Sequence, residues 1–327
     1  MVEPSWTGRR VSIRRVVERR PDGRLLFGDV VGDLVGVDAQ TAVVDTRTGL
    51  VEVPAALIAA AKIAPPSTAA ELALETVAAR GLRPAETAEL GGWLLRADHG
   101  LTRRANSVLP RKQLGMPLTE ALDRAREWYA QRGLPLWIAA PAEARRLLDA
   151  ELGERGWRPF TESHMLAARL DQLNRPAGTV PVAIDAEPDD DWLALYRGGA
   201  GTTDVGRALL TRHDRVAFAS VCLDGRTVAV GRGAVDDEWL GIMAVEVDTA
   251  YRRQGMASAV MAALWRWGGA QGAARSYLQV EVDNTAAVAL YEQLGYWVHH
   301  DYRYRADPAA TAARADPTRE GSGPQPF

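Results

Sequence analysis

The chain has 327 residues, enough for two or three domains, with 47% hydrophobic and 25% charged residues. This balance is that of a folded globular protein and excludes a chain that is mainly disordered, collagenous or coiled-coil. The formal net charge of −3 provides no overall basic field of the kind that dedicated nucleic-acid-binding proteins use. The single cysteine, Cys222, excludes intrachain disulfides and cysteine-based zinc sites, and we expect it to be buried on an apolar strand.

The amino terminus and the apolar stretches give no sign of membrane targeting. The first residues lack the apolar core of a signal peptide. The longest apolar run, residues 53–61, is far shorter than the roughly 18 residues that a membrane span needs. We therefore expect a cytoplasmic protein without membrane contact.

Residues 1–66 predict a small all-β unit, a barrel or a sandwich. Short valine-rich segments alternate with turn sequences such as Pro21-Asp22-Gly23, at a spacing of about ten residues. Residues 9–24 carry seven arginines against Glu18 and Asp22. A nucleic-acid contact would explain this excess. No aromatic residues interleave with the arginines to stack on bases, however, so an ordinary solvated face is the favoured interpretation.

From residue 67 the pattern changes to alternating helices and strands. In residues 67–176 we expect helices at 68–80, 118–132 and 142–155 and strands at 87–97, 101–109, 135–139 and 157–170. The sequence Asp98-His99-Gly100 predicts a hairpin between the first two strands. Arg103, Arg104 and Asn106 make the second strand unusually polar, which is typical either of a wall of a substrate channel or of an exposed edge.

Residues 177–306 predict a second mixed unit, which follows a linker at residues 175–178. Here we expect helices at 189–197, 205–213, 257–271 and 285–294 and strands at 216–223, 227–235, 239–247, 277–282 and 297–304. Short polar turns join the first three of these strands into an antiparallel meander. Residues 307–327 lack apolar periodicity and predict a disordered tail.

The two mixed units are related by an internal repeat. A shift of 139 positions brings four glycine and aromatic positions into register: Trp128 with Trp267, Gly133 with Gly272, Gly156 with Gly295 and Trp157 with Tyr296. Because one shift aligns all four, we infer a duplicated fold.

The segment between the strand at 239–247 and the helix at 257–271 has the features of an anion site. A strand–loop–helix junction presents unpaired backbone N–H groups at the positive end of the helix dipole, which suits a pyrophosphate. Gly255 lets the backbone approach a ligand closely, and Arg252 and Arg253 add positive charge. The loop alone is equally typical of an ordinary helix start, so its assignment depends on further residues.

A second segment, after the strand at 277–282, supplies such residues. Asn284 stands at an expected helix N-cap. Ala287, Leu290, Tyr291 and Leu294 share one face of that helix. Taken alone, Asn284 is more typical of a plain cap, and Tyr291 of a core aromatic residue.

Together the two segments resemble the paired motifs of the GNAT superfamily of N-acetyltransferases: Arg252-x-x-Gly255-x-Ala257 and Asn284-x-x-Ala287-x-x-Leu290-Tyr291-x-x-Leu294-Gly295-Tyr296. The resemblance covers about residues 180–305, and Thr249 stands where the family often has proline. The first mixed unit resembles a degenerate GNAT copy, as in tandem-GNAT proteins. The amino-terminal unit resembles the SH3-like barrel that precedes some actinobacterial GNAT proteins.

The expected fold is therefore α/β (α+β), with a mixed, mostly antiparallel GNAT sheet. The expected domains are an SH3-like β-barrel (1–66), a degenerate GNAT-like domain (67–176), a catalytic GNAT domain (177–306) and a disordered tail (307–327).

The resemblance implies acetyl-CoA as co-substrate and assigns roles to individual residues. Main-chain groups of Val245 and Val247 would pair with the pantetheine arm like an added strand. The residues that would hold the pyrophosphate are Arg252, Arg253, Gln254, Gly255, Met256, Ala257 and Ser258. Asn284 would contact the cofactor arm, and Tyr291 would protonate the leaving thiolate. An N–H group near Val245 would stabilise the oxyanion.

The motifs do not specify the general base. Gly241 and Met243 occupy positions where family members often carry an acid or a histidine. The nearby acids are Glu238, Glu246, Glu281 and Asp283. Glu281 is opposite in parity to the apolar Val280, so it is the candidate that would face the cleft, with a water relay as the alternative.

The residues and the resemblance together predict an acetyl-CoA-dependent N-acetyltransferase without a metal, which acts by direct attack of a primary amine in a ternary complex. The acceptor (a small molecule, a protein lysine or a protein N-terminus) and the oligomeric state are left open. One alternative is a non-catalytic acyl-CoA-binding sensor or scaffold, because no base stands out. Another is a nucleic-acid-associated regulator that acts through residues 9–24. His299 and His300 are adjacent on a strand and would point to opposite faces, so we expect no metal or catalytic role for them.

Overall fold

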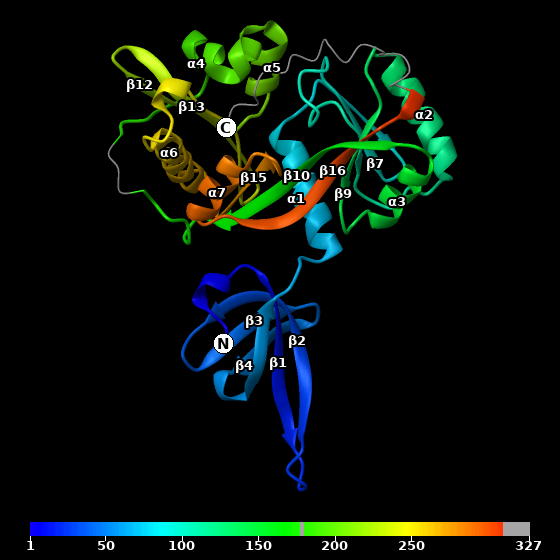
Figure 1. Cartoon of the computed structure of the whole chain (residues 1–327), viewed down its shortest axis with the longest axis vertical. Coiled ribbons are helices and arrows are strands. Elements are labelled where there is room, and N and C mark those ends of the chain that lie inside the picture. Colours follow the sequence, from blue (N-terminus) through cyan, green and yellow to red (C-terminus); the bar gives the residue numbers. More distant parts are fainter. Residues whose placement is uncertain (177–179, 310–327) are drawn as a thin grey trace. The chain divides into compact units, whose positions relative to one another are not determined.

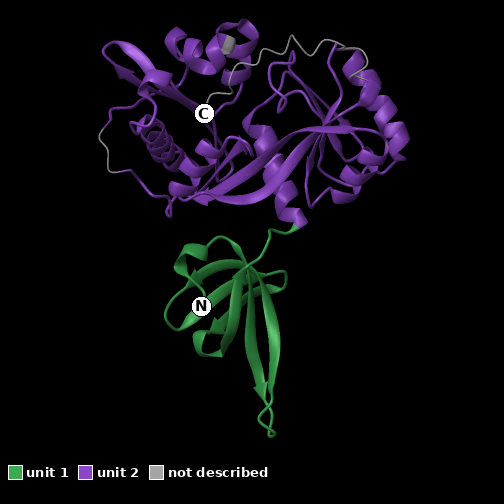
Figure 2. Ribbon diagram, in the orientation of Figure 1, with its two compact units in different colours: residues 1–67 green, residues 68–327 purple. Residues whose placement is uncertain are grey.

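The computed structural model describes residues 1–176 and 180–309, and the chain forms two compact units, Met1–Ser67 and Thr68–Phe327 (Figure 2). The expected tail beyond residue 309 and residues 177–179 of the expected linker lie outside the described residues. In the parts of the chain that are described, no helix is long and apolar enough to cross a membrane.

The first unit is an antiparallel sheet of five strands in the order β4-β3-β2-β1-β5. The strands are β1 (Arg10–Arg19), β2 (Leu25–Val37), β3 (Thr41–Thr46), β4 (Gly49–Pro54) and β5 (Ile58–Ile63), preceded by the 3-10 turn η1 (Pro4–Trp6) and interrupted by η2 (Ala55–Leu57). Alternate side chains, among them Val11, Ile13, Leu34 and Val44, are buried in a small core. The likeness of this unit to an SH3-like barrel remains a prediction.

The second unit begins with the first copy of the repeat. Its elements are α1 (Thr68–Gly81), β6 (Glu86–Leu90), β7 (Trp93–Ala97), β8 (Leu109–Pro110), α2 (Leu118–Ala130), β9 (Trp137–Pro141), α3 (Arg146–Glu154) and β10 (Arg158–Arg169). The hairpin expected at residues 98–100 is wrong, because β6 and β7 turn at Gly91-Gly92. The strand expected at 101–109 is also wrong, because residues 101–107 form turns. The side chain of Asn106 holds these turns together by accepting the N–H groups of Asp98 (2.7 Å) and Gly100 (2.9 Å).

The second copy follows with a longer lead-in. Its elements are β11 (Ala183–Asp185), α4 (Asp190–Leu195), η3 (Tyr196–Thr202), α5 (Asp204–Thr211), β12 (Val216–Leu223), β13 (Arg226–Asp236), β14 (Trp239–Val247), η4 (Thr249–Tyr251), α6 (Met256–Ala270), β15 (Arg275–Glu281), α7 (Thr285–Gln293) and β16 (Trp297–Ala306). Strands β12, β13 and β14 pair in sequence, so the predicted meander is confirmed. The predicted burial of Cys222 is wrong. This residue is exposed, because its side chain has the opposite parity to the buried Ala219 and Val221 of the same strand.

One eight-stranded sheet joins the two copies, in the order β11-β12-β13-β14-β15-β10-β16-β9. Strand β10 of the first copy lies between β15 and β16 of the second copy, and β16 lies between β10 and β9 (Figure 1). The two copies therefore exchange their last strands. Through this exchange, a strand of the first copy, β10, pairs directly with β15 of the second copy.

The element bounds follow the 139-residue repeat. Shifted by 139 positions, α3 coincides with α7 at both ends, α2 falls within α6, and β10 begins where β16 begins. The duplication inferred from four residues is therefore present in the elements themselves. Both copies lie in one compact unit, so the predicted domain boundary at residue 176 stays a prediction.

Helix α6 packs closely on the meander, and small residues make this approach possible. A Cβ atom at Gly231 of β13 would lie 2.5 Å from Cγ1 of Val260, and one at Gly268 of α6 would lie 2.7 Å from Cδ2 of Leu240. The main core of the unit fills the same interface with side chains such as Leu264. The packing fixes the start of α6 beside the end of β14.

Candidate active site

The loop between β14 and α6 ends in a helix start with open space beside it. Gly255 is the N-cap of α6 with a φ of +83°, and a Cβ atom there would meet no atom within 4 Å. The amide of Ala259 donates to the carbonyl of Gly255 (3.0 Å), so the amides of residues 256–258 precede the helix ladder. Three such donors at the positive end of a helix dipole fit a pyrophosphate.

Side chains of the same loop give it a fixed shape. Nε of Arg252 donates to the carbonyl oxygen of Val247 (3.2 Å), and Nε2 of Gln254 donates to that of Ala250 (3.2 Å). Arg253 has a left-handed φ of +64°. Two side chains of the loop thus bind backbone carbonyl groups of the same segment, which holds the loop in one conformation just before Gly255.

Thr249, which stands where the GNAT family often has proline, begins the short turn η4. Asp248 caps this turn, because its carboxylate accepts the N–H group of Ala250 at 3.0 Å. An aspartate cap thus turns the chain into the loop without a proline.

Strands β14 and β15 separate within β14, before the loop begins. Their parallel pairing runs from Trp239 with Arg275 to Ile242 with Leu278. Beyond it the strands continue on opposite sides of one pocket. A register shift against β13 and a φ of +56° at Ala244 mark a bulge at this point, a feature that re-aims side chains and often lies beside a functional site. The main-chain groups of Val245 and Val247 belong to the separated segment.

The pocket has a volume of about 380 Å³ and is lined by both copies of the repeat. The first copy contributes Arg103, Arg104 and Trp137, and the second contributes Glu246, Glu281 and Tyr291, among others. Asn284 and Ala287 line it as well. The pocket thus brings together Glu281, Asn284 and Tyr291, three residues that the sequence singled out.

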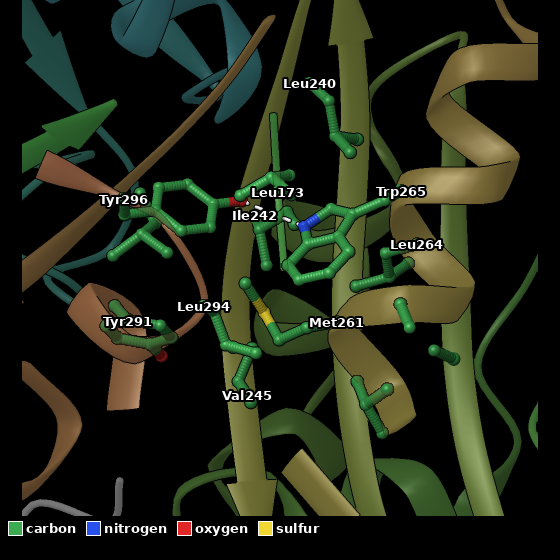
Figure 3. Close-up of a cluster of buried hydrophobic side chains, with 14 of the residues drawn as sticks. Leu173, Leu240, Ile242, Val245, Met261, Leu264, Trp265, Tyr291, Leu294 and Tyr296 are labelled. Atoms are coloured by element: carbon green, nitrogen blue, oxygen red, sulfur yellow. Dashed lines mark hydrogen bonds between the residues drawn. The ribbon is translucent and has the colours of Figure 1, made fainter. Parts of the chain in front are cut away.

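Tyr291 lies on α7 with its side chain almost completely buried. Burial raises its pKa to about 12, although the positive charge of Arg104 acts in the opposite direction. The phenol therefore carries its proton at neutral pH. Figure 3 shows Tyr291 at the edge of the core, beside Tyr296, whose hydroxyl receives the indole N–H of Trp265 (3.0 Å).

Asn284 is the N-cap of α7, as the sequence predicts. Its side-chain oxygen accepts the N–H group of Ala287 at 3.2 Å. This bond uses the oxygen of the side chain, and Asn284 is among the residues that line the pocket.

Glu246 is one of the four acids near the expected site, although the sequence favoured Glu281 as the general base. Glu246 lies on β14 and is only 5% exposed, and both of its carboxylate oxygens accept the backbone N–H of Arg197 at 2.9 Å. Burial raises its pKa to about 7, while the amide and charge of Arg197 and the charge of Arg252 act in the opposite direction. Glu246 is buried by η3, which is about 50 residues away in the sequence. The local sequence around Glu246 therefore does not predict its burial.

Glu281 faces the pocket and forms an ion pair with Arg103 of the first copy. Both side chains are about one quarter to one third exposed. Of the two interpretations left open for Arg103 and Arg104, a channel wall or an exposed edge, their position in the pocket wall favours the first. Asn106 does not belong to the wall: it is buried and stabilises the turns at 98–107.

The first copy lacks the glycine helix start, the side-chain cap and the phenol that the second copy has. Pro117 is the N-cap of α2 and Arg145 that of α3, and neither accepts a side-chain cap hydrogen bond. At the position of Tyr291, 139 residues earlier, stands Leu152, which is fully buried.

The expectation that His299 and His300 point to opposite faces is wrong. Their Nδ1 atoms lie 2.8 Å apart, because a bulge at His299 shifts the register between Met165 and Leu166 of β10. Nε2 of His300 contacts Glu75 of α1 at 3.1 Å, and both side chains are buried. No group of three or more His, Cys, Asp or Glu residues within the described ranges is arranged to hold a metal ion.

Solved structures with the same arrangement define the class of the fold. A GCN5-related N-acetyltransferase from Kribbella flavida superimposes with a TM-score of 0.57 at 18% identity, covering 72% of this chain and 95% of that one. A tandem GNAT protein from the clavulanic acid biosynthesis pathway superimposes with a TM-score of 0.52 at 14% identity, covering 75% and 89%. The fold is that of the GNAT N-acetyltransferases in its tandem form.

The sequence comparisons identify the family within this class. Residues 68–305 match the family model described as probable histone acetyltransferase Rv0428c C-terminal. The chain is 34% identical over 313 residues to the probable histone acetyltransferase Rv0428c of Mycobacterium tuberculosis, a match that covers 92% of this chain and 96% of the relative. It is 25% identical over 224 residues to the uncharacterized N-acetyltransferase YobR of Bacillus subtilis, covering 66% and 90%. The chain belongs to the family of Rv0428c, a family of acetyltransferases.

Proposed function

We propose that this protein transfers the acetyl group of acetyl-CoA to a primary amine by direct attack within a ternary complex. The observation that carries the proposal is one pocket that contains a protonated phenol, Tyr291, and a carboxyl group whose pKa burial raises to about 7, Glu246, on the strand that leads into the helix start at Gly255. Membership of an acetyltransferase family supports it.

Acetyl-CoA brings an activated acetyl thioester to the site. The amides of Met256, Ala257 and Ser258, with the open space at Gly255, hold the pyrophosphate. Arg252, Arg253 and Gln254 shape the loop and add charge. The main chain of Val245 and Val247 extends β14 along the pantetheine arm, and Asn284 contacts the same arm.

Glu246 is the proposed general base, and Tyr291 the proposed general acid. A base with a pKa near 7 is half ionised at neutral pH, which suits removal of a proton from an attacking amine. As the new C–N bond forms, an N–H group of the bulge near Val245 stabilises the oxyanion. Tyr291 then donates its proton to the sulfur as the C–S bond breaks, and Glu246 keeps the proton of the amine.

Glu281 is the second carboxylate of the pocket. Glu281 forms an ion pair with Arg103, and a carboxylate held in an ion pair is less able to accept a proton from the amine. We therefore propose that Glu281 positions Arg103 and is not the base. Should Glu281 instead be the base, its replacement would remove the acidic limb of the pH–rate profile, which separates the two assignments.

We assign catalysis to residues 177–306 and a supporting role to residues 67–176, which supply Arg103 and Arg104 to the pocket wall. The acceptor is a primary amine of a small molecule, or a protein lysine or N-terminus. The second class is the one that the name of the Mycobacterium tuberculosis relative indicates for that relative.

The test is the release of free thiol from acetyl-CoA in the presence of a panel of amines. Thiol release that requires an amine supports the transferase. Tight binding of acetyl-CoA without amine-dependent release for any member of the panel would instead indicate an acyl-CoA sensor.

A further inference from the structure

Arg104 enters the pocket from a loop of the first copy that is held rigidly. The buried carboxylate of Asp98 accepts the amide of Ala85 (2.9 Å) and pairs with Arg212, the C-cap of α5. Asn106 donates to the carbonyl of Thr102 (2.7 Å), closing the loop on itself. Such a network leaves the loop little freedom, so the guanidinium of Arg104 is presented in a defined position.

The partners of Arg104 are neutral. Its Nη2 donates to the carbonyl of Gln279 (3.2 Å), and the hydroxyl of Tyr302 lies beside its guanidinium. Its Nε is buried without a hydrogen-bond partner in the described structure. Within the described residues, no carboxylate forms an ion pair with Arg104, whereas its neighbour Arg103 is paired with Glu281.

A cation in such a position is unusual, because removing a charge from water is costly unless an opposite charge compensates for it. The carboxylates of the pocket do not provide a compensating negative charge for Arg104. Glu281 is neutralised by Arg103, and Glu246 is partly protonated at neutral pH. The pocket therefore offers an unmatched positive charge to its ligand, and its carboxylates are not available to attract a polycation.

We infer that the acceptor is a small amine that also bears a carboxylate, and that this carboxylate pairs with the guanidinium of Arg104. The inference rests on the proposed acetyl transfer and narrows its acceptor. A guanidinium matches a carboxylate with two parallel hydrogen bonds, which fixes the orientation of the acceptor as well as its charge. The aromatic side chains of Trp137, Tyr196 and Tyr304 line the same pocket and suit an apolar or aromatic body.

The test compares acceptors that differ only in the carboxylate: phenylalanine, phenylalaninamide and phenethylamine. With the wild-type protein we expect kcat/KM for phenylalanine to exceed that for the amide by about 10- to 100-fold, the range expected for one hydrogen-bonded charged pair. Arg104→Gln should abolish this preference. Arg104→Lys should retain part of it, because the charge stays while the bidentate geometry is lost.

Arg145→Gln is the matched control. Arg145 also donates to backbone carbonyls, of Pro110 (2.9 Å) and Ala144 (3.0 Å), but it does not line the pocket. We expect this variant to keep the preference for the carboxylate. Unchanged affinity for acetyl-CoA in all three variants would show that the site at α6 is intact.

A binding measurement separates this inference from the proposed activity. Calorimetric titration of the CoA-loaded protein with N-acetylphenylalanine and with its amide reports the carboxylate preference without turnover. Absence of turnover for every amine would contradict the transferase, while tighter binding of the acid, lost in Arg104→Gln, would still support the site. Equal binding of acid and amide would overturn the inference, as would a kcat that falls equally for all acceptors in Arg104→Gln.

Discussion

The carboxylate of Glu246 receives the backbone N–H of Arg197 on both of its oxygens, each at 2.9 Å. One amide donor is little compensation for a buried carboxylate, and burial accordingly raises the pKa of Glu246 to about 7. The bulge at Ala244 and the position of η3 create this environment. The relationship gives the proposed base both its location in the pocket and its working range of pH.

The first prediction concerns the pH–rate profile. Glu246 acts as a base only when ionised, so kcat/KM should rise with pH through about 7 in the wild-type protein. Glu246→Gln should remove this limb and lower turnover by about 10²–10⁴. Glu281→Gln, the matched change in the same pocket, should leave the limb near pH 7 in place.

The second prediction concerns stability. The folded pKa of Glu246 lies above the value of about 4.3 expected in the unfolded chain, so the folded state binds more protons between these two values. The contribution of Glu246 to stability is therefore lost as the pH rises from about 4.3 to about 7. Glu246→Gln should be more stable than the wild type at pH 8, by up to about 4 kcal/mol, and should lose this advantage at pH 4. Urea unfolding at both pH values measures the difference, and a constant difference would contradict the burial of the charge.

The third prediction concerns the loop at Gly255. Gly255→Val should weaken acetyl-CoA binding strongly, because the new side chain fills the open space beside the helix start. Its left-handed φ of +83° adds a stability cost of about 1–2 kcal/mol. Gly272→Val is the matched control. Gly272 has a φ of +90° and open space at its Cβ position, but it follows the other end of α6. Calorimetric titration should find weaker binding only for Gly255→Val, and equal affinities would remove the loop from the cofactor site.

The fourth prediction concerns the proton donor. Tyr291→Phe keeps the ring that packs beside Tyr296, with ring centroids 6.2 Å apart, but removes the hydroxyl. Turnover should fall by about 10²–10⁴ while the protein stays folded. Tyr129→Phe removes a buried hydroxyl that donates to Arg96 outside the pocket (2.9 Å), and it should cost about 1 kcal/mol of stability without loss of turnover. Full activity of Tyr291→Phe would return Tyr291 to a packing role.

The fifth prediction is that each chain binds one acetyl-CoA although the fold is duplicated. In the first copy, Pro117 stands at the helix start and lacks an N–H group, Arg145 makes no side-chain cap, and Leu152 replaces the phenol. Native mass spectrometry with acetyl-CoA should find one cofactor per chain at saturation. Two cofactors per chain would contradict the loss of the first site.

The elements with strong local signals could be predicted from the sequence. The repeat of glycine and aromatic positions correctly predicted that α3 and α7 correspond, and the apolar alternation predicted the meander β12 to β14. The loop at 98–107 could not be predicted in this way. Its turn residues indicate a hairpin, but the side chain of Asn106 satisfies the backbone that a strand would otherwise pair. Cys222 was misplaced because β12 buries Ala219 and Val221 and turns the side chain of Cys222 to the other face. His299 was misplaced because it lies at a bulge, which reverses the alternation that the prediction assumed.

The parts of the candidate site that depend on one short segment could be predicted from the sequence. The loop at Gly255, the cap at Asn284 and the phenol of Tyr291 are local features, and all of them except the loop line one pocket. Glu246 and Arg104 depend on contacts with segments far away in the sequence. η3 buries the first, and the exchange of β10 and β16 places Tyr302 beside the second.

The most direct test of acetyl transfer follows the acetyl group itself. The protein is mixed with acetyl-CoA labelled in the acetyl group and an amine, and free CoA and labelled amide are measured by mass spectrometry in rapidly stopped samples. We expect amide and CoA to form in equal amounts, only when the amine is present, and without a labelled protein intermediate. Binding of acetyl-CoA with no labelled amide for any amine would contradict the account, and a labelled protein that forms before the amide would contradict direct attack.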